Sequence, residues 1–174
     1  RNPPAAAFVA VAVAVNAHVH VEKRLVSSVV VYGRPMTGLF AQSPAAEHRN
    51  DEGLLRMWAP QPGMVLTHVV GRFSVDLAGP FMTFFEDRTK ERGDLGVSGL
   101  HDWTGMTGFD ATIPPRLITF TLRILPRTKR IVVASHSPMI SMAVRAGNLT
   151  LRRIELVEST AELQAAARGV LAAP

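Results

Sequence analysis

The chain has 174 residues, enough for one ordinary domain with an extension and too few for two full-sized domains. Its composition, 47% hydrophobic and 19% charged, supports a sizeable core and excludes disorder along the whole chain. The net charge of +5 favours anionic partners, but the basic residues are dispersed, so a solvated basic surface is favoured over nucleic-acid binding. No cysteine is present, which excludes disulfides and thiolate chemistry and fits a cytoplasmic protein.

The first distinctive segment is residues 5–21, a low-complexity run of Ala and Val that ends with Asn16, His18 and His20. Its length is close to the ~20 residues that a membrane span needs. Three interpretations stay open: a secretory signal or membrane anchor, an added β-strand, and an extension outside the fold. We expect no contact with a membrane unless this segment is an anchor.

A change of composition follows over residues 34–53, which collect Pro, Gly, Ser, Asn and Asp. Such residues favour turns and loops, so this stretch is interpreted as a linker. We therefore expect residues 1–52 to be a low-complexity extension and linker, and residues 53–170 to form the folded domain.

The domain is predicted to begin with a β-hairpin. Residues 54–59 form a short apolar strand, and the Pro60–Gly63 stretch has the composition of a turn. Residues 64–73 are rich in β-branched side chains and form the second strand.

A helix is predicted next over residues 74–92, capped by Ser74 or Asp76 and closed by Gly93. Pro80 must then lie in its first turns. Its apolar side chains recur at helical spacing: Leu77, Phe81, Phe84 and Phe85.

Residues 95–103 are predicted to form a strand, although two glycines weaken it, and residues 104–109 a loop rich in Gly and Thr. Asp110 or Thr112 is then expected to cap a helix that carries prolines in its first turn and ends at Pro126. Its predicted apolar face consists of Leu117, Phe120, Thr121 and Ile124.

The run over residues 130–134 is short and continuously apolar, as expected of a buried parallel strand. The Ser135–Pro138 stretch should cap a helix over residues 139–146, which Gly147 and Asn148 should end.

Residues 152–157 are predicted to form a last strand, followed by a helix that starts with a capping box of Ser159 and Glu162. Strands and helices thus alternate after the hairpin. The predicted fold class is α/β, with a mixed, mostly parallel sheet, an N-terminal β-hairpin and about four helices.

The loop after the strand at residues 95–103 carries the most distinctive chemistry, because α/β sheets bind their ligands at the carboxyl ends of parallel strands. Asp102-Trp103-Thr104 ends that strand, and Asp110-Ala111-Thr112 follows after a short spacer. This pattern resembles STAS domains (sulfate transporter and anti-sigma factor antagonist), in which Asp-x-Ser is followed by Asp-Ser at the start of a helix. Residues 53–170 are similar to the divergent, sporulation-antagonist-like branch of that group.

The resemblance implies a STAS-like fold and a regulatory, protein-binding role in signalling, with an anti-sigma factor or a kinase-like signalling protein as partner. The residues that it implies for partner binding are Asp102, Thr104, Asp110, Ala111 and Thr112. In anti-sigma factor antagonists, the residue after the second Asp is a phosphorylated Ser, and here it is Ala111. The phosphoswitch is therefore not implied, although Thr112 is a possible phosphosite.

An alternative function is a carrier of a small ligand or a lipid. The resemblance of this branch to lipid-transfer α/β domains suggests it, as do the apolar helices that contain Met and Phe. His101, Ser135 and His136 are the candidate ligand-binding residues at the edge of the sheet.

Catalysis by a Ser/His/Asp set is the third possibility, because Ser135-His136-Ser137 could face His101-Asp102 across the carboxyl edge. No G-x-S-x-G, phosphate loop or G-x-G-x-x-G is present, so no enzyme activity is predicted. No cofactor and no metal site is predicted either, since the His18/His20 pair lies in the doubtful extension.

Overall fold

The computed structural model describes residues 38–172. A six-stranded sheet runs through it, and the spatial order of the strands is their order in the chain. The first pairings, β1–β2 and β2–β3, are antiparallel, and the pairings from β3 to β6 are parallel. The strands are β1 (Ala46–Arg49), β2 (Gly53–Trp58), β3 (Met64–Phe73), β4 (Val97–Phe109), β5 (Thr128–Ala134) and β6 (Ile154–Val157). The predicted α/β class, with a mixed sheet and a hairpin, is confirmed.

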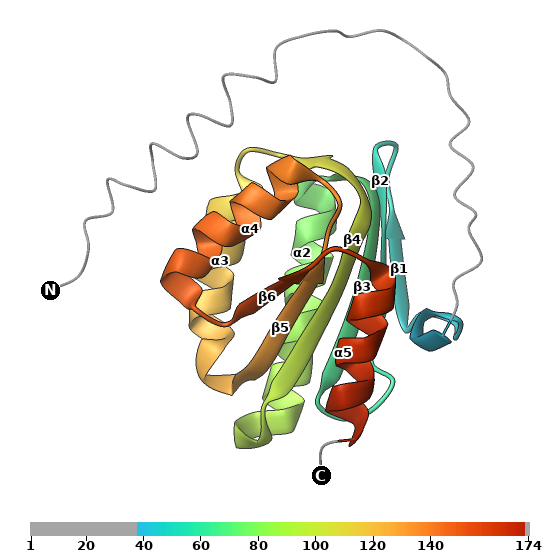
Figure 1. Ribbon diagram of the computed structural model, residues 1–174, viewed down its shortest axis with the longest axis vertical. Coiled ribbons are helices and arrows are strands. Elements are labelled where there is room, and N and C mark those ends of the chain that lie inside the picture. The colour runs from blue at the N-terminus through green and yellow to red at the C-terminus, as the bar shows by residue number, and fades with distance from the viewer. Residues whose placement is uncertain (1–37, 173–174) are drawn as a thin grey trace, which may run out of the picture. The chain divides into compact units, whose positions relative to one another are not determined.

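Four helices cover the two faces of this sheet (Figure 1). One face carries α2 (Val75–Arg92), α3 (Ile113–Ile124) and α4 (Pro138–Leu151). The other face carries α5 (Thr160–Ala172). No helix of residues 38–172 is long and apolar enough to cross a membrane.

Two hydrophobic clusters hold these layers together. The larger cluster lies between the sheet and α2, α3 and α4, and includes Phe73, Phe85 and Phe120. The smaller one lies under α5, where Leu163 packs against Leu100 and its neighbours. Strands buried on both faces require the continuous apolar runs that the sequence shows in β3 and β5.

The linker predicted over residues 34–53 is replaced by structure from residue 38 onward. A short 3-10 helix, Gly38–Phe40, places the ring centroid of Phe40 5.2 Å from that of Trp58. The Phe40 side chain is buried. Strand β1 follows as the outer strand of the sheet and pairs with β2. The residues of β1, AEHR, show no hydrophobic pattern, because three of the four side chains are exposed. Backbone pairing with β2 keeps this strand in the sheet. The interpretations of residues 5–21 fall outside the described residues.

Strand β4 is longer than predicted, and the prediction of a loop over residues 104–109 is wrong. This stretch continues the strand and pairs with β3 as far as Phe109, beyond the end of β5. Two register shifts accommodate extra residues of β4 opposite β3. A Cβ atom at Gly105 would lie 3.1 Å from the Val70 side chain, so the glycine that suggested a loop instead permits close strand pairing.

Helix α4 also extends beyond its predicted end at Gly147 and Asn148, because both residues have tertiary roles. Gly147 is buried, and a Cβ there would lie 3.6 Å from the Ile118 side chain on α3. The Asn148 side chain accepts a hydrogen bond from Ile154 N (2.9 Å) and donates one to Ile154 O (2.8 Å), which ties α4 to β6. The helix ends at Leu151 and is followed by Arg152, which has a left-handed conformation, so the last strand starts two residues later than expected.

The predicted capping is confirmed for two helices. In α4, Ser137 Oγ accepts from Ile140 N, and in α5, Ser159 Oγ accepts from Glu162 N. The prediction is wrong for α3, because Thr112 makes no hydrogen bond from its side chain as a cap. Asp110 caps a different helix, α2, as described below.

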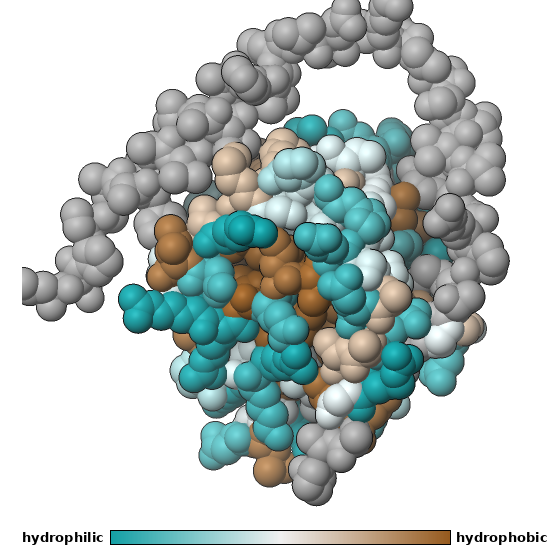
Figure 2. All heavy atoms as spheres, viewed as in Figure 1, coloured by the Kyte–Doolittle hydropathy of each residue, from teal (hydrophilic) through white to brown (hydrophobic). Residues whose placement is uncertain are grey.

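The outer strand β6 contributes half-buried apolar side chains: Ile154, Leu156 and Val157. Figure 2 shows hydrophobic side chains near the centre of this view, surrounded by hydrophilic ones. Ile154 also belongs to the wall of the cavity that is described next.

Candidate functional site

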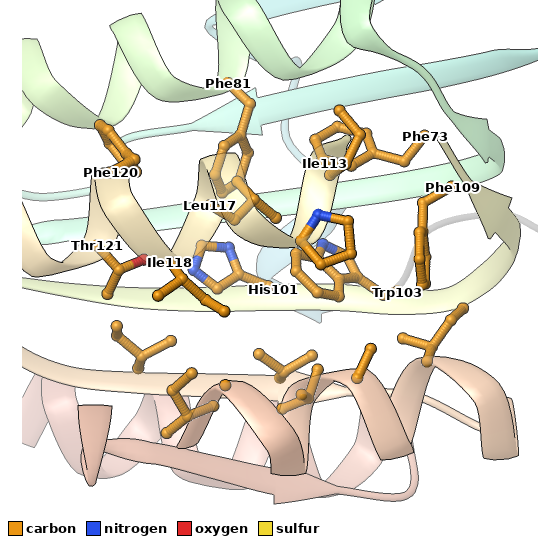
Figure 3. A pocket seen from close by; sticks show the side chains of 18 of the residues that line it. Phe73, Phe81, His101, Trp103, Phe109, Ile113, Leu117, Ile118, Phe120 and Thr121 are labelled. Atoms are coloured by element: carbon orange, nitrogen blue, oxygen red, sulfur yellow. The ribbon is translucent and has the colours of Figure 1, made fainter. Parts of the chain in front are cut away.

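A cavity of about 100 Å³ lies inside the larger cluster, between the sheet and the three helices on that face (Figure 3). Its strand wall consists of Phe73, His101, Trp103, Met106, Phe109, Ile131, Val133 and Ile154. Its helix wall consists of Phe81, Phe85, Ile113, Pro114, Leu117, Ile118, Phe120, Thr121, Ile124, Ile140, Ala143, Val144, Gly147 and Leu151. No charged carboxylate, Lys or Arg is among these residues, so the space suits an apolar occupant.

Strand alternation explains why β4 supplies two polar groups to this wall. Side chains of successive residues point to opposite faces of a sheet. His101 and Trp103 therefore face the cavity, while Asp102 between them faces α5. In Figure 3 both rings stand on β4 and reach into the space below α3.

His101 is buried among aromatic rings. Its ring centroid lies 5.4 Å from that of Phe81, 5.9 Å from that of Phe85 and 5.8 Å from that of Trp103. Its Nδ1 is hydrogen-bonded to Thr67 Oγ1 at 2.9 Å. Burial without a carboxylate partner lowers the pKa of His101 to about 3, so the ring is neutral at ordinary pH.

Space for the His101 ring depends on Gly99, two residues earlier on the same face of β4. A Cβ atom at Gly99 would lie 2.6 Å from Phe85 Cε2 and 2.7 Å from His101 Nε2, closer than real Cβ contacts allow. The glycine that made this strand weak by propensity is therefore needed for the packing of the cavity wall.

Trp103 presents a buried, unsatisfied donor at the wall. The side chain is 8% exposed, and its Nε1 is buried without a hydrogen-bond partner among the described residues. An indole nitrogen can only donate, and a buried donor without a partner is destabilising. Figure 3 shows this nitrogen on the side of the ring that points away from β4.

Several half-buried residues of the wall lie on α3 and α4. Leu117, Ile118 and Thr121 of α3 are half-buried, and so is Ala143 of α4. The strand residues of the wall that face these helices, such as Val133, are buried. The cavity therefore comes near to solvent between α3 and α4, and also at the half-buried strand residues Phe109 and Ile154.

The predicted partner-binding residues fall into two groups. Asp102 is buried, and its Oδ1 accepts from Thr104 N (3.0 Å) and Thr104 Oγ1 (2.6 Å). Its Oδ2 accepts from Thr160 Oγ1 at 2.8 Å, in the first turn of α5. Asp102 and Thr104 thus tie β4 to α5. His68 lies opposite Asp102 in β3, and burial lowers its pKa.

The second group lies at the far end of β4. Asp110 Oδ1 forms an ion pair with Arg72, in which both Nε and Nη2 lie 2.9 Å away, and Oδ2 accepts from Val75 N at 2.9 Å. Asp110 therefore caps the N-terminus of α2. Ala111 and Thr112 are exposed where α3 begins.

The residues predicted to bind a ligand at the sheet edge are also separated. Ser135 is buried, and its Oγ accepts from Ser137 N at 3.2 Å. His136 is exposed. His101 faces the interior cavity, and Asp102 faces the other side of the sheet, so His101 and Asp102 do not form the pair that a Ser/His/Asp set needs. No group of three metal-binding side chains occurs within residues 38–172.

The sequence singled out His101 and the apolar helices but missed Trp103 and the cavity itself. Alternation along residues 99–103 was the available signal, because it places the side chains of His101 and Trp103 on one face. The cavity itself leaves no signal in the sequence, because the apolar residues that line it follow the same pattern as those of a filled core.

No family model matches the chain, and no curated protein matches it. Two solved structures are similar in fold. One is the anti-sigma factor antagonist SpoIIAA in its unphosphorylated form, with 8% identity, coverage of 68% of this chain and 99% of that one, and a TM-score of 0.52. The other is an uncharacterized protein of the DUF3478 family with a SpoIIAA-like fold, from Shewanella loihica PV-4, with 13% identity, coverage of 68% and 87%, and a TM-score of 0.48. The first likeness confirms the expected STAS-like fold.

Proposed function

We propose that this protein is a binding module that holds a small apolar ligand in the cavity between the sheet and α2, α3 and α4. The observation that carries the proposal is the cavity of about 100 Å³ with an almost wholly apolar wall. Protein interiors are normally close-packed, with few voids larger than a water molecule. An engineered apolar cavity of about 150 Å³ stays dry and binds benzene or xenon.

The geometry of the wall supports reversible entry of such a ligand. Three of its half-buried residues, Leu117, Ile118 and Ala143, lie on two facing helices. Small shifts of side chains on α3 and α4 open the cavity without breaking strand pairing. Gly147 presents no side chain to Ile118 where the two helices meet.

Benzene serves as the probe for this proposal. A ligand that binds only the folded state stabilises it by about 1.4 kcal/mol at ten times its dissociation constant. We expect benzene to raise the thermal unfolding midpoint of the wild type. Ala143→Leu adds carbon atoms at the cavity wall and should abolish this rise. Ala146→Leu is the matched control, because Ala146 is a half-buried alanine of α4 that does not line the cavity.

Two outcomes would contradict the proposal. Absence of any benzene-induced rise in the wild type would show that the cavity does not take up apolar ligands. An equal rise in Ala143→Leu and the wild type would place binding elsewhere on the protein.

A second candidate function is regulatory protein binding in signalling, with an anti-sigma factor or a kinase-like protein as the partner. The fold is that of an anti-sigma factor antagonist, and Ala111 and Thr112 are exposed at the start of α3, where the resemblance implies partner contact. Asp110 would fix this edge by capping α2, and Asp102 and Thr104 would support it from the interior.

Substitution at the edge tests the second candidate. A partner that wild-type bait captures should be lost from Ala111→Arg and kept by Ala165→Arg, which changes an exposed alanine of α5 on the opposite face. If all three baits capture the same proteins, the surface at the start of α3 does not bind the partner. Thr112 stays a possible phosphosite, and intact-mass analysis after incubation with a candidate kinase tests it, with Thr112→Ala as the control.

A further inference from the structure

The polar groups of the cavity wall restrict the chemistry of its occupant. Three lining residues carry nitrogen or oxygen in their side chains: His101, Trp103 and Thr121. His101 already shares a hydrogen bond with Thr67 Oγ1. Thr121 is half-buried on α3. Of these three residues, Trp103 carries a buried donor, Nε1, that has no partner among the described residues.

An occupant that stacks near Trp103 is complementary to this donor only if it offers an acceptor. The indole N–H cannot accept, so a second donor in the same place would leave both groups unpaired. A hydrocarbon fills the space but leaves the donor unsatisfied. A molecule with one acceptor fills the space and satisfies the donor, and gains affinity for that reason.

The wall offers no charged side chain that would pair with an ionic occupant. The lining residues include no Lys, Arg, Asp or Glu. Removing an unpaired ion from water costs far more than removing a neutral polar group. An anionic ligand such as a fatty-acid carboxylate, if its head entered the cavity, would meet no cation there.

We propose that the ligand of this cavity is a small, neutral, largely apolar molecule with one hydrogen-bond acceptor, which accepts a hydrogen bond from Trp103 Nε1–H. This inference rests on the proposed ligand-binding function and assigns Trp103 as the residue that determines specificity. Trp103 is 8% exposed and its Nε1 is buried, so an acceptor reaches this atom when side chains of the wall shift as the ligand enters.

Benzene and pyridine test the inference, because they have nearly the same shape and pyridine adds one acceptor. At a pH where pyridine is neutral, the ratio of pyridine affinity to benzene affinity should be about tenfold higher in the wild type than in Trp103→Phe. The ratio cancels the change in cavity size that the substitution causes. Trp58→Phe should keep the wild-type ratio, because Trp58 Nε1 donates to Gln42 O at 2.8 Å and Trp58 does not line the cavity.

The indole N–H resonances give a direct second readout. The chain contains two tryptophans, so two such resonances are expected, and the two variants assign them. Pyridine should move the Trp103 proton downfield, benzene should not do so, and the Trp58 resonance should stay in place. N-methylpyridinium, a charged molecule of the size of toluene, should bind far more weakly than toluene.

The outcomes separate the two proposals. Binding of benzene with an unchanged affinity ratio in Trp103→Phe, and no downfield shift with pyridine, would overturn the assignment of Trp103 and leave the cavity as a site for hydrocarbons. Tight binding of N-methylpyridinium would overturn the requirement for a neutral ligand. If none of the molecules binds, the proposed function itself fails.

Discussion

Replacement of His101 by Gln should remove a large part of the acid sensitivity of this protein. The folded state holds the pKa of His101 at about 3, whereas the unfolded chain has the ordinary value of 6.5. Below pH 6.5 the unfolded state therefore binds a proton that the folded state does not bind. Stability is fully present above that pH and is lost as the pH falls towards 3.

The size of this effect follows from the two pKa values. When the unfolded state binds one proton more than the folded state, the unfolding free energy falls by about 1.4 kcal/mol for each pH unit of acidification. Between about pH 7 and pH 4.5 the wild type should lose about 2.5 kcal/mol more of its unfolding free energy than His101→Gln loses. His68, whose pKa is also lowered by burial, contributes equally to both proteins, and its effect cancels in this comparison.

Urea unfolding at a series of pH values measures these free energies. His136→Gln is the control, because His136 is exposed, and its pH dependence should follow that of the wild type. Parallel pH dependences of the wild type and His101→Gln would refute the reasoning, since they would mean that His101 titrates alike in the folded and unfolded states.

Two further substitutions test the packing around the site. Thr160→Val removes the hydroxyl that donates to Asp102 Oδ2 and should lower the unfolding free energy by about 1.5–3 kcal/mol, whereas Thr150→Val, at an exposed position of α4, should change it little. Equal effects in urea unfolding would show that the Asp102 contact does not hold α5. Gly99→Ala should cost about 1–3 kcal/mol by overpacking Phe85 and His101, whereas Gly79→Ala, in open space within α2, should be neutral or stabilising. A neutral Gly99→Ala would contradict the described fit of the cavity wall.

The sequence allowed most of the fold to be predicted because the inner elements carry strong local signals. The continuous apolar runs of β3 and β5 and the capping box of α5 indicated these elements correctly. Strand β1 was missed because its exposed polar side chains carry no alternating hydrophobic pattern, and its pairing with β2 depends on backbone hydrogen bonds and on the Arg56–Glu47 ion pair.

The remaining differences arise where tertiary contacts override local propensity. Gly105 and Gly147 both suggested an end to an element, but Gly105 lies where β3 approaches closely and Gly147 is buried against Ile118 of α3. The site was harder to predict for the same reason. His101 could be identified as a candidate, but its neutral state results from burial. Phe81 and Phe85, which help to bury it, come from a different element, α2.

The central claim, that the cavity between the sheet and α2, α3 and α4 is a ligand site, is tested most directly by crystals of the protein equilibrated with benzene. We expect a benzene molecule enclosed between Trp103 and Ile118, with no rearrangement of the sheet. Benzene found only on the surface, or a cavity closed by its own side chains at full benzene saturation, would contradict the claim.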